Sequence, residues 1–186
     1  MKSPDRDEAF NLLTEYTKNE NLVKHALAVE AAMRHYARKF GEDEDLWGVV
    51  GLLHDFDYER YPSLEDHPFK GADILRSRGY DEAFVKAILS HASHTNVPRE
   101  TKMERTLFAV DELCGMVTAV ALVRPSKRVA EVSVKSVKKK LKDRAFARSV
   151  NRDDIRAGAE EMNIPLPDHI QNVIEAMQGI SDDLGL

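Results

Sequence analysis

Four polar residues in otherwise apolar segments could together bind a metal ion: His25, His54, Asp55 and Asp111. His25 lies on the apolar stripe of a predicted helix, and Asp111 interrupts an apolar run, so both side chains should point inward. A buried carboxylate costs several kcal/mol unless a positive charge neutralises it, and Asp111 has no Lys or Arg one helical turn away. Imidazole nitrogens and carboxylate oxygens are ligands of divalent transition metals. We therefore predict that these four side chains surround a catalytic cation.

The elements that position these residues should all be helices, because apolar residues recur with helical period and almost no segment alternates with period two. In the first predicted helix, Ser3 is the cap and Pro4 the first residue, and the second stops at Gly41. Asn151 opens a late helix, and Asp168 caps the last one, which closes at Gly179. The expected ranges are about 4–17, 21–40, 44–54, 68–77, 82–91, 102–123, 134–142, 151 onward and 168–179. The predicted fold is an all-α bundle in one domain spanning 1–186.

Composition limits the class of protein. A chain of 186 residues with 42% apolar residues can bury a core without disulfides, and its one cysteine, Cys114, lies in an apolar stretch. No apolar run approaches the roughly 18 residues of a membrane span, and the first residues lack the apolar core of a signal peptide. These features predict a cytoplasmic protein with no membrane partner.

Charge is distributed unevenly along the chain. The net charge of −5 argues against stable nucleic-acid binding. Residues 124–152, however, hold eleven Lys or Arg against Glu131 and Asp143, a local charge of +9 that leaves −14 elsewhere. This basic segment either attracts an anionic substrate or is a solvated helix face, and the sequence leaves both interpretations open.

The order His25, then His54-Asp55 after an apolar helix, then Asp111 in a later helix resembles the H…HD…D signature of the HD-domain metal-dependent phosphohydrolase superfamily, of the HDIG type. The segment 67–75, His-Pro-Phe-Lys-Gly-Ala-Asp-Ile-Leu, is similar to the HPxxGAxIL segment of its two-metal branches. The resemblance covers about residues 20–122 and leaves a C-terminal helical extension of about 125–186.

The resemblance implies a binuclear centre. In the two-metal branches, further ligands are a histidine of the HPxxG segment and one that ends the next helix, which correspond to His67 and His91. One divalent ion would then be held by His25, His54, Asp55 and Asp111, the other by His67 and His91, with Asp55 bridging. The resemblance does not indicate which divalent metal is bound among Fe, Mn, Co, Zn, Ni and Mg.

The function implied is hydrolysis of a phosphoester, of a nucleotide or another small phosphorylated metabolite, by a metal-bound hydroxide. His54, Asp55 and Asp111 would be catalytic through the metal, and Lys70 and Arg60 are candidates to hold the substrate phosphate. The spacing also resembles that of small HD hydrolases that split diadenosine tetraphosphate. Two alternatives remain open: a mixed-valent di-iron oxygenase of the same fold, and a non-catalytic nucleotide sensor.

One departure from the family pattern narrows this interpretation. The Gly-Tyr-Pro triplet of the HD-GYP branch is absent after His91, which argues against cyclic dinucleotide hydrolysis. Of the remaining histidines, His35 and His169 are expected at the surface, and His94 could replace His91 as a ligand. Glu112 should point about 100° away from Asp111 and lie outside the ligand set.

Overall fold

The computed structural model describes residues 5–186, and all regular secondary structure in this part of the chain is helical, which confirms the predicted all-α class. The α-helices are α1 Arg6–Tyr16, α2 Glu20–Phe40, α3 Glu44–Leu53, α4 Phe69–Ser77, α5 Glu82–Ser90, α6 Lys102–Leu122, α7 Val134–Leu141, α8 Arg152–Glu161, α9 Leu166–Gln178 and α10 Ser181–Leu184. Two short 3₁₀ turns, η1 Ser93–Thr95 and η2 Val129–Glu131, flank α6.

The helix ends follow local sequence signals. The side chain of Asn19 caps α2 by accepting a hydrogen bond from the amide of Asn21, and Gly41 ends that helix in the left-handed conformation at φ 68°. Thr101 and Glu104 form a reciprocal capping box at the start of α6. These signals set the positions of the two longest helices.

Two of the predicted helix starts need correction. Ser3 and Pro4 lie outside the described residues, and α1 is capped instead by Asp5, whose carboxylate accepts from the amides of Asp7 and Glu8. The prediction that Asp168 caps the last helix is wrong, because α9 begins at Leu166 and Asp168 lies in its first turn. An acid in that turn still interacts favourably with the helix dipole.

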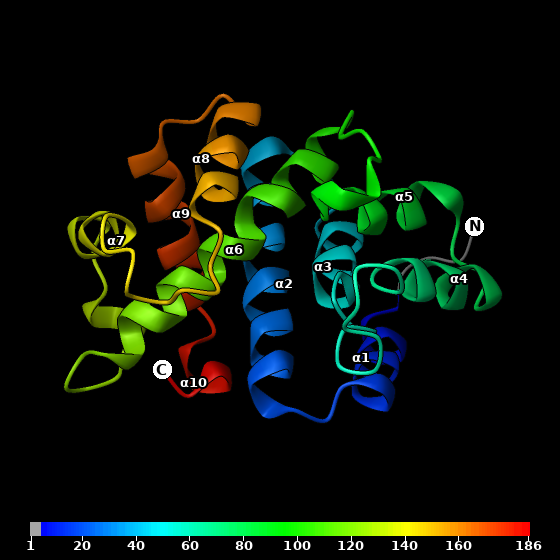
Figure 1. Ribbon diagram of the computed structural model, residues 1–186, viewed down its shortest axis with the longest axis horizontal. Coiled ribbons are helices and arrows are strands. Elements are labelled where there is room, and N and C mark those ends of the chain that lie inside the picture. The colour runs from blue at the N-terminus through cyan, green and yellow to red at the C-terminus, as the bar shows by residue number, and fades with distance from the viewer. Residues whose placement is uncertain (1–4) are drawn as a thin grey trace.

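The two long helices α2 and α6 cross in the middle of the molecule (Figure 1). Helices α1, α3, α4 and α5 lie to one side of them, and α7, α8, α9 and α10 lie to the other. Helix α2 packs against α3, α6 and α9, so it joins both sides. One cluster of buried apolar residues runs from Ala9 in α1 to Leu184 in α10. On this continuity we propose that the HD-like core and the C-terminal helices form one domain.

Cys114 is fully buried in α6, as its apolar surroundings predict. Burial, with the charge of Asp111, raises the pKa of its thiol well above the usual value. Within residues 5–186, no helix combines the length and the apolar character needed to cross a bilayer.

Candidate metal centre

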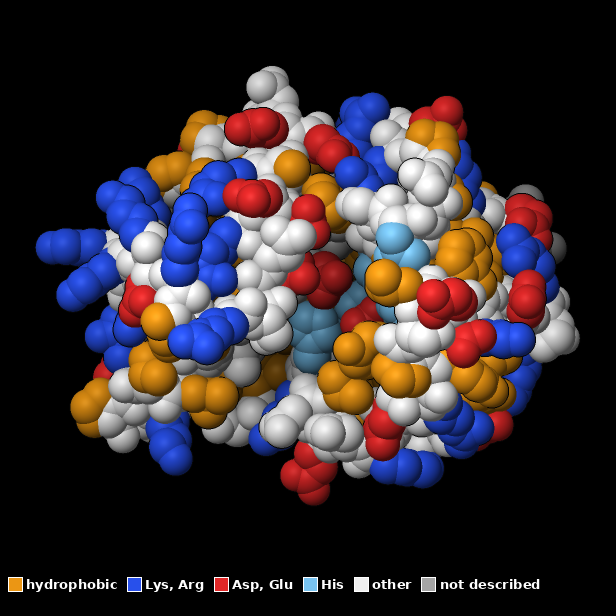
Figure 2. Space-filling view, viewed as in Figure 1, with side chains coloured by type: hydrophobic (Ala, Val, Ile, Leu, Met, Phe, Trp, Pro, Cys, Tyr) orange, Lys and Arg blue, Asp and Glu red, His pale blue; other side chains and the backbone are white. Residues whose placement is uncertain are grey.

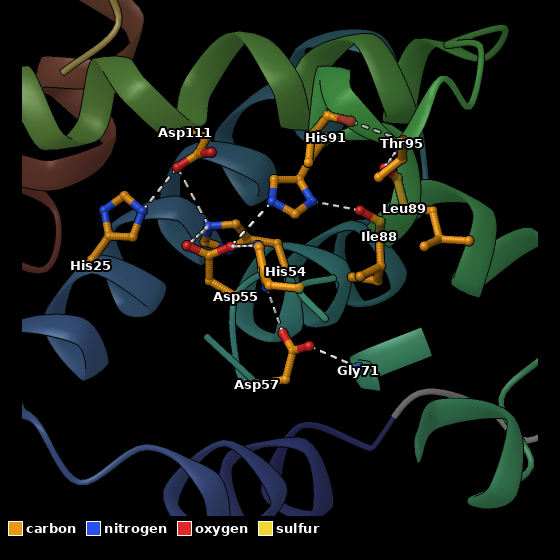
Figure 3. A network of polar contacts seen from close by, with 12 residues as sticks. His25, His54, Asp55, Asp57, Gly71, Ile88, Leu89, His91, Thr95 and Asp111 are labelled. Carbon is orange, nitrogen blue, oxygen red and sulfur yellow. Dashed lines mark hydrogen bonds and ion pairs between the residues drawn. The ribbon is translucent and has the colours of Figure 1, made fainter. Parts of the chain in front are cut away.

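The six residues predicted as ligands converge on one site from five parts of the fold, and Figure 3 labels five of them, all but His67. They come from α2, from the end of α3, from the segment before α4, from the end of α5 and from the middle of α6; in that order they are His25, His54 with Asp55, His67, His91 and Asp111. Because α2 and α6 cross here, residues 86 positions apart make direct contact: His25 Nε2 lies 2.9 Å from Asp111 Oδ1.

Backbone carbonyl groups fix the proton on two of the histidines. His54 Nδ1 lies 2.8 Å from the carbonyl oxygen of Gly51, and His91 Nδ1 lies 2.5 Å from that of Ile88. A carbonyl oxygen only accepts hydrogen bonds, so Nδ1 carries the proton in each neutral ring and Nε2 presents a lone pair. This is the usual arrangement of a metal-binding histidine, whose second nitrogen is held by a neighbouring acceptor.

The Nε2 atoms are directed at the two carboxylates. His67 Nε2 and His91 Nε2 each lie 3.1 Å from Asp55 Oδ1, and His54 Nε2 lies 3.4 Å from Asp111 Oδ1 and 3.6 Å from Asp55 Oδ2. His54 Nε2 and Asp55 Oδ1 are both buried, and neither has a hydrogen-bond partner within the described part of the chain. Carboxylate oxygens therefore face imidazole nitrogens, and either protons on those nitrogens or a cation between the two kinds of group would satisfy both.

Asp55 is common to two sets of candidate ligand atoms. His25, His54 and Asp55 have ligand atoms within 4.8 Å of one another, and so do Asp55, His67 and His91. Asp111 adjoins the first set through its contacts with His25 and His54. This arrangement fits two cations with Asp55 between them.

Electrostatics favour positive charge at this site. Burial lowers the pKa of His54, but Asp55 and Asp111 overcome this and raise it to about 9. The same balance, with Asp55 and Asp57 as the neighbouring carboxylates, raises the pKa of His67 to about 10. The carboxylates thus attract either protons or a metal to these rings, and metal binding would displace the protons.

Asp57 is a functional residue that the sequence analysis missed. Its side chain is almost completely buried; Oδ1 accepts from His67 Nδ1 at 2.8 Å and Oδ2 accepts from the backbone N–H of Gly71 at 2.7 Å. It therefore holds the His67 ring toward the site. The signal in the sequence is an acid two residues after the His-Asp pair, inside an otherwise aromatic stretch.

A polar cavity of about 280 Å³ opens from the centre to solvent. Figure 2 shows it as a hollow in the middle of one face, with histidine and acidic side chains at its floor. Four of the candidate ligands, all but His25 and His54, line it, and so do Tyr58, His94, Glu112 and Asp154. Burial, followed by the charge of Asp111, raises the pKa of Glu112 to about 7. Glu112 thus lies beside the centre and outside the two ligand sets, as expected.

The predicted phosphate-binding residues do not line this cavity. The Arg60 guanidinium stacks 4.1 Å from the centre of the Tyr16 ring and also donates to the carbonyl oxygen of Glu15, so it is held against α1. Lys70 is exposed in the first turn of α4. Neither side chain is among the cavity-lining residues, and their role as substrate contacts stays a prediction.

The other histidines take different places from those expected. His94 Nε2 lies 2.9 Å from the carbonyl oxygen of His67, so His94 supports the loop, and the ligand position is taken by His91. The surface assignment of His169 is wrong: it is fully buried, between the Tyr36 hydroxyl and a backbone carbonyl. His35 is half-buried, and burial lowers its pKa.

Comparisons with known proteins agree with this geometry. The chain is 31% identical over 88 residues to a tRNA (cytidine(56)-2'-O)-methyltransferase of Thermoplasma volcanium; the match covers 47% of this chain and 26% of that protein. The chain thus spans about a quarter of the length of this curated relative. No solved structure gives a significant match. The model of the HD domain matches residues 22–116, just over half of the chain, and includes all six candidate ligands. This chain therefore belongs to the HD domain family.

Proposed function

We propose that this protein is a metal-dependent phosphohydrolase that cleaves a phosphoester of a small metabolite, nucleotides included. One observation carries the proposal: the Nε2 atoms of three histidines are directed at two carboxylates around Asp55. Such a set needs positive charge, from protons or from a cation, and its division into two groups that share Asp55 suits a pair of divalent ions.

The protein's own residues would position both the ions and the substrate. His25, His54, Asp55 and Asp111 would hold one ion, and His67 and His91 would share Asp55 with the second. When bound, a pair of divalent ions activates water and neutralises charge that develops on a phosphoryl group. The polar cavity admits a phosphate from one side, and Tyr58 at its wall, with its ring 5.3 Å from that of His67, shields that ligand.

A screen tests this function directly. Protein purified without added metal is analysed for its metal content. It is then assayed for inorganic phosphate release from phosphomonoesters and nucleotides, and for nucleotide products from dinucleoside polyphosphates, with Mn²⁺, Co²⁺, Fe²⁺, Ni²⁺, Zn²⁺ or Mg²⁺. We expect turnover that chelation abolishes and metal restores. Bound iron with oxygen consumption and no hydrolysis product would contradict the proposal and support an oxygenase. Nucleotide binding with no product would support a sensor.

For partners, we propose a small phosphorylated substrate and no stable nucleic-acid complex, on the basis of the net charge of −5. On the face shown in Figure 2, Lys and Arg gather at one end of the molecule, over α7. Filter binding of a labelled RNA at about 0.15 M salt tests this, and tight binding would contradict it.

A further inference from the structure

A second cavity adjoins the metal centre on the other side of His25. It has a volume of about 280 Å³ and lies between α2, α6 and the C-terminal residues. Its lining residues are Asn21, Lys24 and His25 of α2, Gly115, Thr118 and Leu122 of α6, and Leu184, Gly185 and Leu186. His25 belongs both to this wall and to the candidate ligand set, so this side chain connects the second cavity to the metal centre, although it does not line the polar cavity.

The cavity extends along the same two helices that carry metal ligands. Asn21 lies one helical turn before His25, and Thr118 lies two turns after Asp111. At 1.5 Å of rise per residue, Thr118 lies about 10 Å along α6 from Asp111. A substrate with its phosphate at the metal centre could therefore place its organic part beside Thr118.

Four polar groups face this cavity without a protein partner. Among residues 5–186, no hydrogen bond or ion pair is found for the side chains of Asn21, Lys24 or Thr118, or for Nδ1 of His25. His25 differs in this respect from the other three ligand histidines, whose Nδ1 atoms all have an acceptor. If Nε2 of His25 binds a metal, its Nδ1 would carry a proton and could donate a hydrogen bond to a bound molecule.

Apolar walls with a few convergent polar groups are typical of a small-molecule site. Leu122 and Leu184 supply apolar surface, and Lys24, Thr118, Asn21 and His25 supply hydrogen-bond donors, one of them charged. A cavity of about 150 Å³ holds a benzene ring, so this one has room for a single ring with a substituent. Because these four side chains can all donate hydrogen bonds, we expect the cavity to favour a ligand with acceptor atoms or a carboxylate.

We propose that this cavity is the specificity pocket of the enzyme: it binds the organic part of the substrate, a ring-sized, largely apolar group with an anionic or acceptor-rich end that contacts Lys24. The proposal rests on the phosphohydrolase function proposed above. Asn21, Lys24 and Thr118 are then substrate-binding residues, and His25 links the pocket to the metal centre.

The pocket is tested by binding, which does not depend on turnover. The probe is 3-carboxybenzylphosphonate, which cannot be hydrolysed as an ester, and its affinity for the metal-loaded protein is measured by calorimetry. We expect Lys24→Met to weaken binding at least about tenfold, because the ammonium is lost and the apolar stem is kept. Thr118→Trp, which fills the cavity, should abolish binding. Lys135→Met makes the same change at an exposed lysine of α7; it is the matched control and should leave the affinity unchanged.

A second measurement separates this proposal from the function it rests on. For the corresponding esters, phenyl phosphate and 3-carboxyphenyl phosphate, Lys24→Met should raise KM for the carboxylated ester alone and leave kcat unchanged. The pocket proposal would be overturned if the parent protein, Lys24→Met and Thr118→Trp bound the phosphonate with equal affinity. It would also be overturned if the parent protein did not bind the phosphonate at all, even if esters are hydrolysed. Lys24-dependent binding with no ester hydrolysed would uphold the pocket and overturn the proposed activity.

Discussion

His54 and His169 are both fully buried in the same bundle, yet they are held in opposite ways. His169 uses both ring nitrogens: Nε2 donates to the carbonyl oxygen of Ala109 at 2.8 Å, and Nδ1 accepts from the Tyr36 hydroxyl at 2.6 Å. His54 uses only one, since Nδ1 donates to Gly51 and Nε2 is left beside Asp55 and Asp111. Burial therefore does not distinguish a structural histidine from a ligand; the partner of the second nitrogen does.

The charge around each ring follows from this difference. Burial lowers the pKa of His169 to about 4, although the bond to Ala109 opposes the shift, so the ring stays neutral at pH 7. Burial is the largest single influence on His54 and lowers its pKa, but the combined effect of Asp55 and Asp111 is greater and raises the pKa to about 9. The environment of His169 excludes positive charge and that of His54 attracts it. The following experiments test this comparison.

The largest effect is expected for Asp55→Ala, which removes the carboxylate that both ligand groups share. The three Nε2 atoms around it lose their common neighbour, so we expect both ions to be lost and turnover to fall at least about 1000-fold, roughly 4 kcal/mol. Metal content by mass spectrometry and phosphate release measure the two losses. Asp73→Ala removes an exposed carboxylate of α4 that pairs with Arg76, and should change neither. Full metal content in Asp55→Ala would refute the bridging role.

Replacing each histidine by leucine should separate structure from metal binding. His169→Leu removes the acceptor of the Tyr36 O–H, whose oxygen still accepts from Asn172 Nδ2, and the side-chain donor to the Ala109 carbonyl. We therefore expect the free energy of unfolding to fall by about 3 kcal/mol with metal content unchanged.

His54→Leu should abolish binding of one ion. In the metal-free protein it removes both the bond to Gly51 and the attraction of the protonated ring for Asp55 and Asp111, so it too should lower the free energy of unfolding. Urea denaturation in EDTA and metal analysis measure the two effects, and loss of metal from His169→Leu or full metal content in His54→Leu would remove the distinction.

The lowered pKa of His169 predicts a pH dependence of stability. The unfolded imidazole, with a pKa near 6.5, binds protons more readily than the folded one, with a pKa of about 4. Stability from this group is therefore complete above pH 6.5 and is lost as the pH falls toward 4. At pH 5 we expect a loss of about 2 kcal/mol relative to pH 7.5.

This dependence is measured by urea denaturation of the metal-free protein, compared with His169→Gln. Glutamine offers a donor and an acceptor but does not titrate. The ligand histidines titrate in both proteins, so their contribution cancels in the difference. Identical pH profiles would show that His169 is not the group responsible.

The sequence predicted four of the six candidate ligands from local signals. His25 and Asp111 interrupt apolar helical stripes, and His54-Asp55 ends a buried helix, so the need for a cation follows from burial alone. His67 and His91 came from the family resemblance, since nothing in their spacing places them next to Asp55. Most helix ends were predicted to within a residue or two, because Gly and Asn or Thr caps mark them.

The errors concern residues whose role depends on a distant partner. His169 was assigned to the surface because it follows Asp168 at a helix start, although it lies four residues before Val173 on the buried stripe of α9. Its partners Tyr36 and Ala109 are 133 and 60 positions away. Arg60 stacks on Tyr16, a contact that the sequence did not indicate, and its role as a phosphate contact stays a prediction. Neither contact leaves a periodic pattern in the sequence.

The smallest effect is expected at Asp57, which acts on the metal only through His67. Asp57→Asn keeps one acceptor for His67 Nδ1 but places an NH₂ group where Gly71 N–H now donates, so the ring should be held less firmly. We expect the affinity for the second ion to fall about tenfold, roughly 1.4 kcal/mol, with the first ion retained. Titration of the metal-free protein with Co²⁺, followed by visible absorption, resolves the two binding steps.

Gly71→Ala, whose Cβ would lie 2.8 Å from Asp57 Cγ, should weaken the same step, because the carboxylate must move. Weakening of the first step instead would assign Asp57 to the other ion.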